Sequence, residues 1–157
     1  MELLLLFNLS VVMILTFTVM KKGLNPLENI FMFMVLEFFI TSYFSILYVN
    51  TKVWELTNDV SGFIAFRLFE VILLPFAYLI YFNLRSAISK KLGRIVLLFV
   101  TVFITLILEK VLVILGIIKY KNWEYYLSFL LIIVLMLVIQ LLQVTYKKLL
   151  KKEGIWT

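Results

Sequence analysis

Five mostly apolar stretches, each long enough to cross a bilayer as a helix, dominate the chain. They cover about Leu3–Met20, Leu27–Val49, Ser61–Phe82, Ile95–Ile118 and Tyr125–Tyr146. Hydrophobic residues make up 64% of the 157 residues and charged residues only 15%, which is too little charge to cover so much apolar surface in water. We therefore predict an all-α fold, a polytopic membrane bundle of five transmembrane helices. Residues 1–157 form a single integral membrane domain with a basic tail over 147–157.

The basic residues between the stretches predict the orientation of the bundle. With the N-terminus outside, the outer connections hold only Lys52, Lys119 and Lys121. The inner connections and the tail then hold Lys21, Lys22, Arg85, Lys90, Lys91, Arg94, Lys147, Lys148, Lys151 and Lys152. Loops on the cytoplasmic side carry an excess of Lys and Arg. The N-terminus is therefore expected outside, the C-terminus inside, and the protein in the plasma membrane.

Local signals predict where several spans begin and bend. Glu2 stands where a signal peptide has basic residues, and no small-residue cleavage site follows, so the first stretch is expected to be an uncleaved span. The run Asn25-Pro26-Leu27-Glu28 is typical of a helix start, with Glu28 as a capping residue. Asp59 or Ser61 is expected to cap the third span, and Pro75 to kink it. Aromatic side chains are expected at the outer membrane boundary at Trp54, Tyr120, Trp123, Tyr125 and Tyr126.

The three middle spans carry charges where lipid would be expected. These residues are Glu37, Arg67, Glu70, Glu109 and Lys110. Each charge at the bilayer centre costs about 2.5–3.5 kcal/mol on insertion scales, so the five groups are not expected to face lipid separately. Counting along the helices places the three glutamates within roughly 5 Å of the midplane. We predict one buried polar cluster in which Arg67 and Lys110 neutralise two glutamates, Arg67 pairing with Glu70, Glu37 or Glu109.

Two interpretations of this cluster stay open. Ion pairs between helices can fix their packing and register without any further activity. Alternatively, the glutamate left without a cation can form a proton- or cation-responsive site in a small polar cavity. The sequence does not separate a sealed helix contact from a continuous aqueous path.

The composition excludes several kinds of chemistry. The chain has no Cys and no His, which removes thiolate nucleophiles, the commonest general base and most transition-metal sites. No phosphate-binding glycine motif occurs, so we expect no cofactor. Three glutamates could in principle bind a divalent cation, but Arg67 and Lys110 would repel it, so no metal is expected. The C-terminal lysines are expected to contact anionic lipid at the inner leaflet, and no nucleic acid is expected.

Short motifs in the third and fourth stretches resemble a known family. They are Phe69-Glu70-Val71-Ile72-Leu73-Leu74-Pro75 followed by Tyr81-Phe82-Asn83, and Leu108-Glu109-Lys110 followed by Tyr120-Lys121-Asn122-Trp123 and Ser128. They resemble a family of small uncharacterised multi-pass membrane proteins of spore-forming Firmicutes, over roughly Leu36 to Gln140. That family has Asp where Glu70 stands here. The resemblance implies the fold and membrane residence, and no activity.

Three functions are compatible with these observations. The favoured hypothesis is a non-enzymatic accessory or interaction protein of the bacterial plasma membrane, which binds a membrane-protein partner or a second copy of itself. The alternative is a small proton- or ion-coupled channel or transporter that uses Glu37, Glu70 and Glu109. An intramembrane enzyme is the least favoured, because carboxylates alone would have to perform its chemistry.

Overall fold

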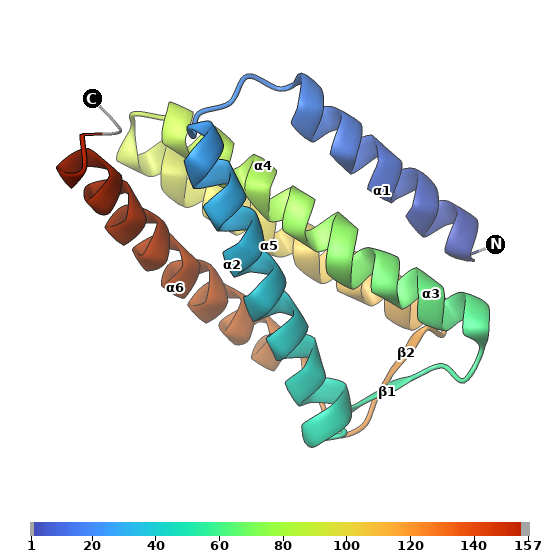
Figure 1. Ribbon diagram of the computed structural model, residues 1–157. Coiled ribbons are helices and arrows are strands. Elements are labelled where there is room, and N and C mark those ends of the chain that lie inside the picture. Colours follow the sequence, from blue (N-terminus) through green and yellow to red (C-terminus); the bar gives the residue numbers. More distant parts are fainter. Residues whose placement is uncertain (1, 155–157) are drawn as a thin grey trace.

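The computed structural model describes residues 2–154 and is built almost entirely of helices (Figure 1). The helices are α1 (Glu2–Val19), α2 (Pro26–Ser45), α3 (Val60–Leu68), α4 (Leu74–Ala87), α5 (Lys91–Ile114) and α6 (Tyr125–Lys152). Two π-helical turns, η1 (Ile46–Asn50) and η2 (Phe69–Leu73), extend α2 and join α3 to α4, and two strands, β1 (Trp54–Leu56) and β2 (Ile118–Tyr120), complete the fold.

The predicted number of long apolar helices is confirmed. Five helices are long and apolar enough to cross a membrane: Glu2–Val19, Pro26–Asn50, Val60–Ala87, Lys91–Ile114 and Tyr125–Lys152. The last helix continues through most of the predicted basic tail. Residues 155–157 of that tail lie outside the described residues.

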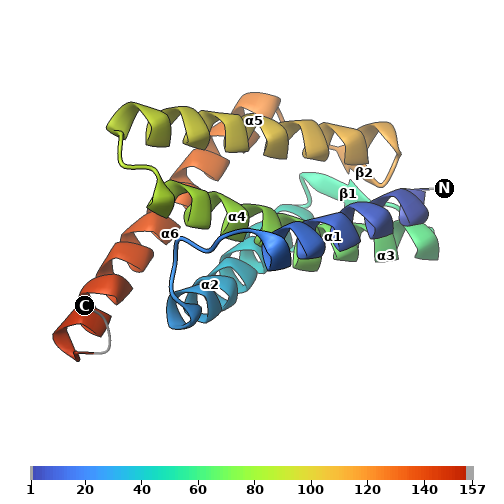
Figure 2. The same ribbon diagram turned by 90° about the horizontal axis from the view of Figure 1, so that it is seen from above.

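The continuous helix α3–η2–α4 is the centre of the bundle. It packs against α1, α2 and α5, while α6 packs against α2 and α5. Half of the residues in the apolar stretch of this central helix are buried, against 11% of those in α1. Helix α1 therefore lies at the periphery, and α6 crosses α5 and diverges from it toward the C-terminus (Figure 2).

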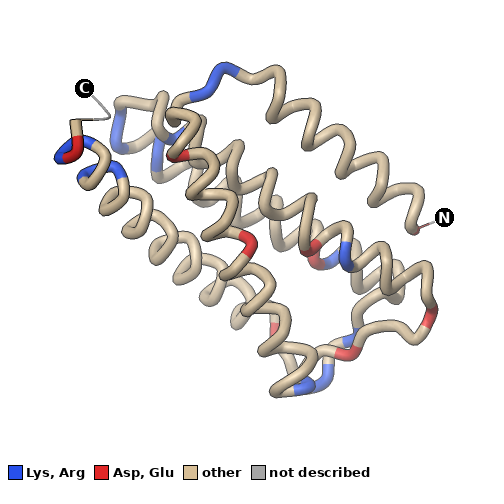
Figure 3. Tube along the Cα trace, in the orientation of Figure 1, with Lys and Arg blue, Asp and Glu red and all other residues tan. Residues whose placement is uncertain are grey.

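The bundle has two chemically different ends, which we name the ribbon end and the tail end. The ribbon end holds β1, β2 and the first residues of α1, and the tail end holds the last turns of α4 and α6 with the first turn of α5 (Figure 1). Basic side chains gather at the tail end, whereas the ribbon end carries both signs of charge (Figure 3). The two ends of the described chain therefore lie at opposite ends of the bundle, as five passes require.

The predicted helix starts at α2 and α3 are confirmed. The Asn25 side chain accepts a hydrogen bond from the Glu28 backbone N–H at 2.7 Å, and the Glu28 carboxylate accepts one from the Asn25 N–H at 3.1 Å. The Asp59 carboxylate accepts from the Gly62 N–H at 3.0 Å and from the Ser61 hydroxyl. Both caps satisfy backbone donors that a helix start otherwise leaves unpaired.

Pro75 does not end the third long helix. Proline has no N–H, and its ring clashes with the carbonyl four residues earlier in a regular α-helix. The wide turn η2 comes directly before Pro75, and the Leu74 N–H bonds to the carbonyl of Phe69, five residues back. A π-turn therefore lies just before Pro75, where the sequence predicts a kink, and the helix runs on to Ala87.

The antiparallel ribbon at the ribbon end corrects two sequence predictions. Trp54 pairs with Tyr120 and Leu56 with Ile118, so residues 115–118 are not part of the fourth long helix. Helix α5 ends at Ile114, and Gly116 adopts a positive φ of 70°, a conformation that favours glycine and stops helices. Trp54 lies at the ribbon end, as predicted, but only 1% of its surface is exposed, so its ring packs inside the protein and does not face the surroundings.

Candidate functional site

Glu109 lies at the ribbon end of α5 in a network made by its own chain. Its carboxylate accepts hydrogen bonds from the Tyr120 hydroxyl and, at 2.6 Å, from the Ser128 hydroxyl. Ser128 in turn accepts one from the Trp123 indole N–H at 2.8 Å. The turn after Ile114 brings Tyr120 back over Glu109, and the start of α6 brings Ser128. Both hydrogen bonds reach the same oxygen, Oε1, of this nearly buried carboxylate, and neither donor is a cation.

Tyr120 is a donor in this network. Burial and the neighbouring Glu109 carboxylate raise the pKa of the Tyr120 hydroxyl above its ordinary value of 10.0, so the hydroxyl keeps its proton at neutral pH. The adjacent cavity, lined by Tyr43, Tyr78 and Thr105 as well as Glu109, has a volume of about 20 Å³. A space of this size holds about one water molecule.

The prediction that Lys110 neutralises a glutamate is wrong, and Glu109 is not paired with Arg67. Glu109 lines one small cavity together with Phe69 and Leu74 of the central helix and Tyr43 of α2, so it lies close to the depth of Glu70. Its hydrogen bonds nevertheless go to Tyr120 and Ser128. Lys110 is exposed on the outer side of α5 and therefore does not join the cluster. From that position its long side chain can reach the bundle end.

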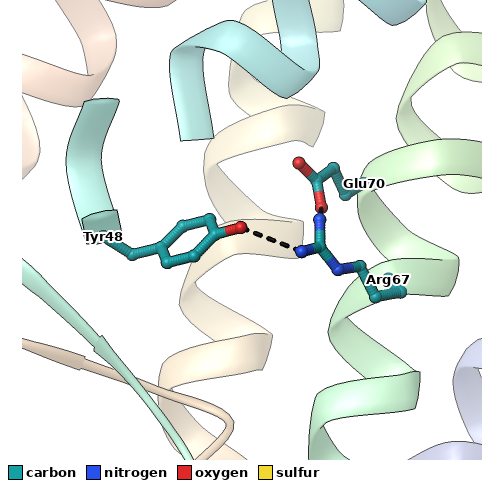
Figure 4. A network of polar contacts seen from close by, with 3 residues as sticks. All are labelled: Tyr48, Arg67 and Glu70. Atoms are coloured by element: carbon teal, nitrogen blue, oxygen red, sulfur yellow. Dashed lines mark hydrogen bonds and ion pairs between the residues drawn. The ribbon is translucent and has the colours of Figure 1, made fainter. Parts of the chain in front are cut away.

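Arg67 and Glu70 form an ion pair in the middle of the bundle (Figure 4). One guanidinium nitrogen lies 2.5 Å from the Glu70 carboxylate, and the other donates to the Tyr48 hydroxyl at 3.0 Å. The i,i+3 spacing places Arg67 and Glu70 on one face of the central helix, and the extension η1 of α2 brings Tyr48 across to them. The sequence predicted the ion pair as one of three alternatives, and Tyr48 is an additional partner.

Glu37, on α2, lies within electrostatic range of Glu70. One oxygen of Glu37 and one of Glu70 are buried without a hydrogen-bond partner among residues 2–154. The Glu70 side chain is 0% exposed, but the Arg67 side chain is 39% exposed, and Glu37 is also partly exposed. We call Glu37, Tyr48, Arg67 and Glu70 the polar face. It is an incomplete network, and two of its members, Arg67 and Glu37, are partly exposed.

A third polar network closes the tail end, and it is built on Asn83, which the sequence analysis did not identify as a network residue. The Asn83 side chain is fully buried. It accepts hydrogen bonds from the backbone N–H groups of Gly23 and Leu24, both at 3.1 Å, and donates to Asn29 at 2.7 Å. A polar residue directly after the predicted apolar span was the available signal. The network holds the connection between α1 and α2 against α4.

Within residues 2–154, no three acidic side chains come together as a metal site would require. In the polar face, one of the two Glu70 carboxylate oxygens is held by the Arg67 cation.

Comparison with known proteins does not assign this chain to a family. No protein-family model, no curated protein and no solved structure matches the chain. The resemblance to membrane proteins of spore-forming Firmicutes stays a prediction from the residues that suggested it.

Proposed function

We propose that the chain is a multi-pass protein of a bacterial plasma membrane, with the ribbon end outside and the tail end inside. The five long apolar helices support membrane residence. The tail end holds ten of the fifteen Lys and Arg residues, and the positive-inside rule therefore favours this end for the cytoplasm.

Within that membrane we propose a non-enzymatic accessory or interaction protein that binds its partner through the polar face. The observation that carries this proposal is the partly exposed Arg67, 39% of whose side chain remains uncovered although Arg67 lies inside the long apolar helix Val60–Ala87. A charge within an apolar span is costly when it faces lipid. Glu109 accepts two hydrogen bonds from its own chain, whereas Glu37 keeps a buried oxygen without a partner among residues 2–154. A membrane helix of another protein would supply the missing contacts.

The chemistry of the polar face defines the partner helix. The exposed groups are one cation and one carboxylate, so the partner presents hydrogen-bonding or charged side chains at the same depth. A second copy of this chain also meets that condition, because Arg67 of one copy and Glu37 of the other form a complementary pair across a two-fold axis.

The alternative function, ion-coupled transport, has less support. A coupling carboxylate must exchange protons or ions with water on both sides of the membrane. Glu109 is 3% exposed, and the enclosed cavity beside it holds about one water molecule. Within residues 2–154, the polar face and the Glu109 network are also separate sites rather than steps of one path.

A photo-crosslinking experiment in native membranes tests the interaction. Phe63 is 41% exposed, and its ring lies 5.1 Å from the Arg67 guanidinium carbon, so Phe63→benzoylphenylalanine places a probe beside the polar face. Phe103, 58% exposed on α5, is the matched control position. We expect a discrete protein adduct from position 63 and none from position 103.

The double variant Arg67→Leu/Glu70→Gln sharpens the same test. It removes both charges of the ion pair and leaves no fully buried carboxylate without its cation, so we expect the protein to insert while the adduct at position 63 disappears. An adduct of twice the chain's mass identifies a second copy as the partner. Adducts to lipid alone at position 63, or equal protein adducts at both positions, would contradict the proposal.

A further inference from the structure

A groove at the tail end lies between α4, α5 and α6, away from the polar face. Its volume is about 460 Å³, within the range of small-molecule sites. It opens where α6 diverges from α5 (Figure 2). None of the residues that line it is acidic.

The groove changes from basic to apolar along its length. Arg85, Lys91 and Arg94 lie at its mouth, in the last turns of α4 and the first turn of α5. Ile95 and Leu98 of α5 and Leu137 of α6 form the walls further in. On α5 the positions 91, 94, 95 and 98 fall on one helical stripe, so a single face of the helix carries first the charges and then the apolar side chains.

The cations at the mouth are partly held in position. The Arg94 Nε donates to the backbone carbonyl of Ile88 at 2.7 Å, which fixes the guanidinium and leaves its two terminal nitrogens for another acceptor. Arg85 comes from a different helix, in the last turn of α4. With no acidic side chain lining the groove, the positive charge at this mouth has no counter-charge within it.

We propose that this groove binds one anionic phospholipid. The phosphate lies among Arg85, Lys91 and Arg94, and an acyl chain lies along Ile95, Leu98 and Leu137. Two features together select this ligand. A phosphate group matches the guanidinium geometry at the mouth, and the apolar wall requires a ligand that continues into the hydrocarbon. This inference does not rest on the partner proposed for the polar face.

Native mass spectrometry of the purified full chain in neutral detergent tests the site. The protein is titrated with phosphatidylglycerol or with phosphatidylcholine, with and without inorganic phosphate as a competitor. We expect a single phosphatidylglycerol to be retained with clear preference over phosphatidylcholine. Inorganic phosphate that displaces this lipid would overturn the proposal in favour of a simple anion site.

Charge-matched variants locate the binding. Arg85→Gln/Lys91→Gln removes two charges from the mouth and spares the structural hydrogen bond of Arg94. Lys151→Gln/Lys152→Gln removes two exposed charges of the same end outside the groove. Each basic residue near anionic lipid usually contributes about 1 kcal/mol to binding. The groove variant lacks two such residues, so it should bind phosphatidylglycerol at least about tenfold more weakly. The tail variant should bind it as the wild type does.

A third variant tests the apolar wall. Leu137→Trp fills the groove from the exposed side of α6 and leaves every charge in place. We expect it to lose the retained lipid while keeping its fold, as reported by an unchanged melting temperature. Equal losses in the groove and tail variants would show diffuse charge attraction, and full retention in Leu137→Trp would show that no acyl chain lies there. Either result would overturn the proposal.

Discussion

Arg67 and Glu109 show two ways in which this chain holds a charge among apolar helices. One oxygen of Glu109 accepts hydrogen bonds from both Tyr120 and Ser128, so its own chain supplies neutral donors. Arg67 is paired with Glu70 on one side and remains partly exposed on the other. An ionised group that is buried without partners is far more costly than a lost surface contact, so the two sites respond differently to substitution.

The substitution Arg67→Leu should destabilise the protein strongly. It leaves the fully buried Glu70 carboxylate without its cation, and breaking such a pair costs roughly 3 kcal/mol. Adding Glu70→Gln should restore most of this loss, whereas adding Glu37→Gln should not. Thermal unfolding followed by size-exclusion chromatography in detergent measures each variant. An Arg67→Leu protein as stable as the wild type would show that the ion pair is not needed.

Glu109→Gln tests whether that carboxylate is structural. The amide keeps an acceptor but loses the charge that strengthens two hydrogen bonds, so we expect a loss of about 2 kcal/mol. Tyr120→Phe should cost a similar amount, and the double variant less than the sum, because the two residues share one hydrogen bond. Proteoliposomes should show no ion flux with either wild type or variant. Wild-type flux that disappears in Glu109→Gln would support the transporter hypothesis instead.

At the scale of the elements, the helix starts are the features best predicted from sequence. Asn25 and Glu28 carry a complete capping box, and Asp59 caps α3, because these signals are local and need no tertiary contact. The ion pair of Arg67 and Glu70 was foreseeable for the same reason, since a spacing of three residues fixes their common face.

The ribbon was not predictable in the same way. Strand β2 continues an apolar run, and short apolar runs fit a buried helix or a strand equally well. The pairing of Trp54 with Tyr120 depends on two segments far apart in the chain. Gly116 was the one available signal, as a helix-ending residue. Missing it hid the turn that brings Tyr120 back to Glu109.

The cap of α3 should make stability depend on acid. Hydrogen bonds from Ser61 and Gly62 hold the pKa of the Asp59 carboxyl below its ordinary value of 3.8. The stabilisation is therefore present above that value and is lost as the pH falls through the lower folded-state pKa. The melting temperatures of wild type and Asp59→Ala should differ at neutral pH and converge in strong acid. A difference that persists unchanged in strong acid would refute this role of the carboxylate.

At the scale of the whole molecule, the distribution of charge follows the two ends of the bundle. The tail end is strongly basic and the ribbon end is mixed (Figure 3). The central helix α3–η2–α4 runs between them and carries Arg67 and Glu70 of the polar face in its first half. This arrangement determines what it costs to leave the polar face exposed. Arg67 and Glu37 are costly to expose only when the middle of the bundle lies in hydrocarbon.

Cysteine labelling of the whole chain tests that central claim most directly. The protein has no native cysteine, so Lys119→Cys reports the ribbon end and Lys90→Cys the tail end without interference. Both positions are exposed. In intact cells, a membrane-impermeant maleimide should label position 119 and should reach position 90 only after the membrane is permeabilised. Labelling of position 90 in intact cells, or of both positions in a soluble fraction, would contradict the membrane topology on which the account rests.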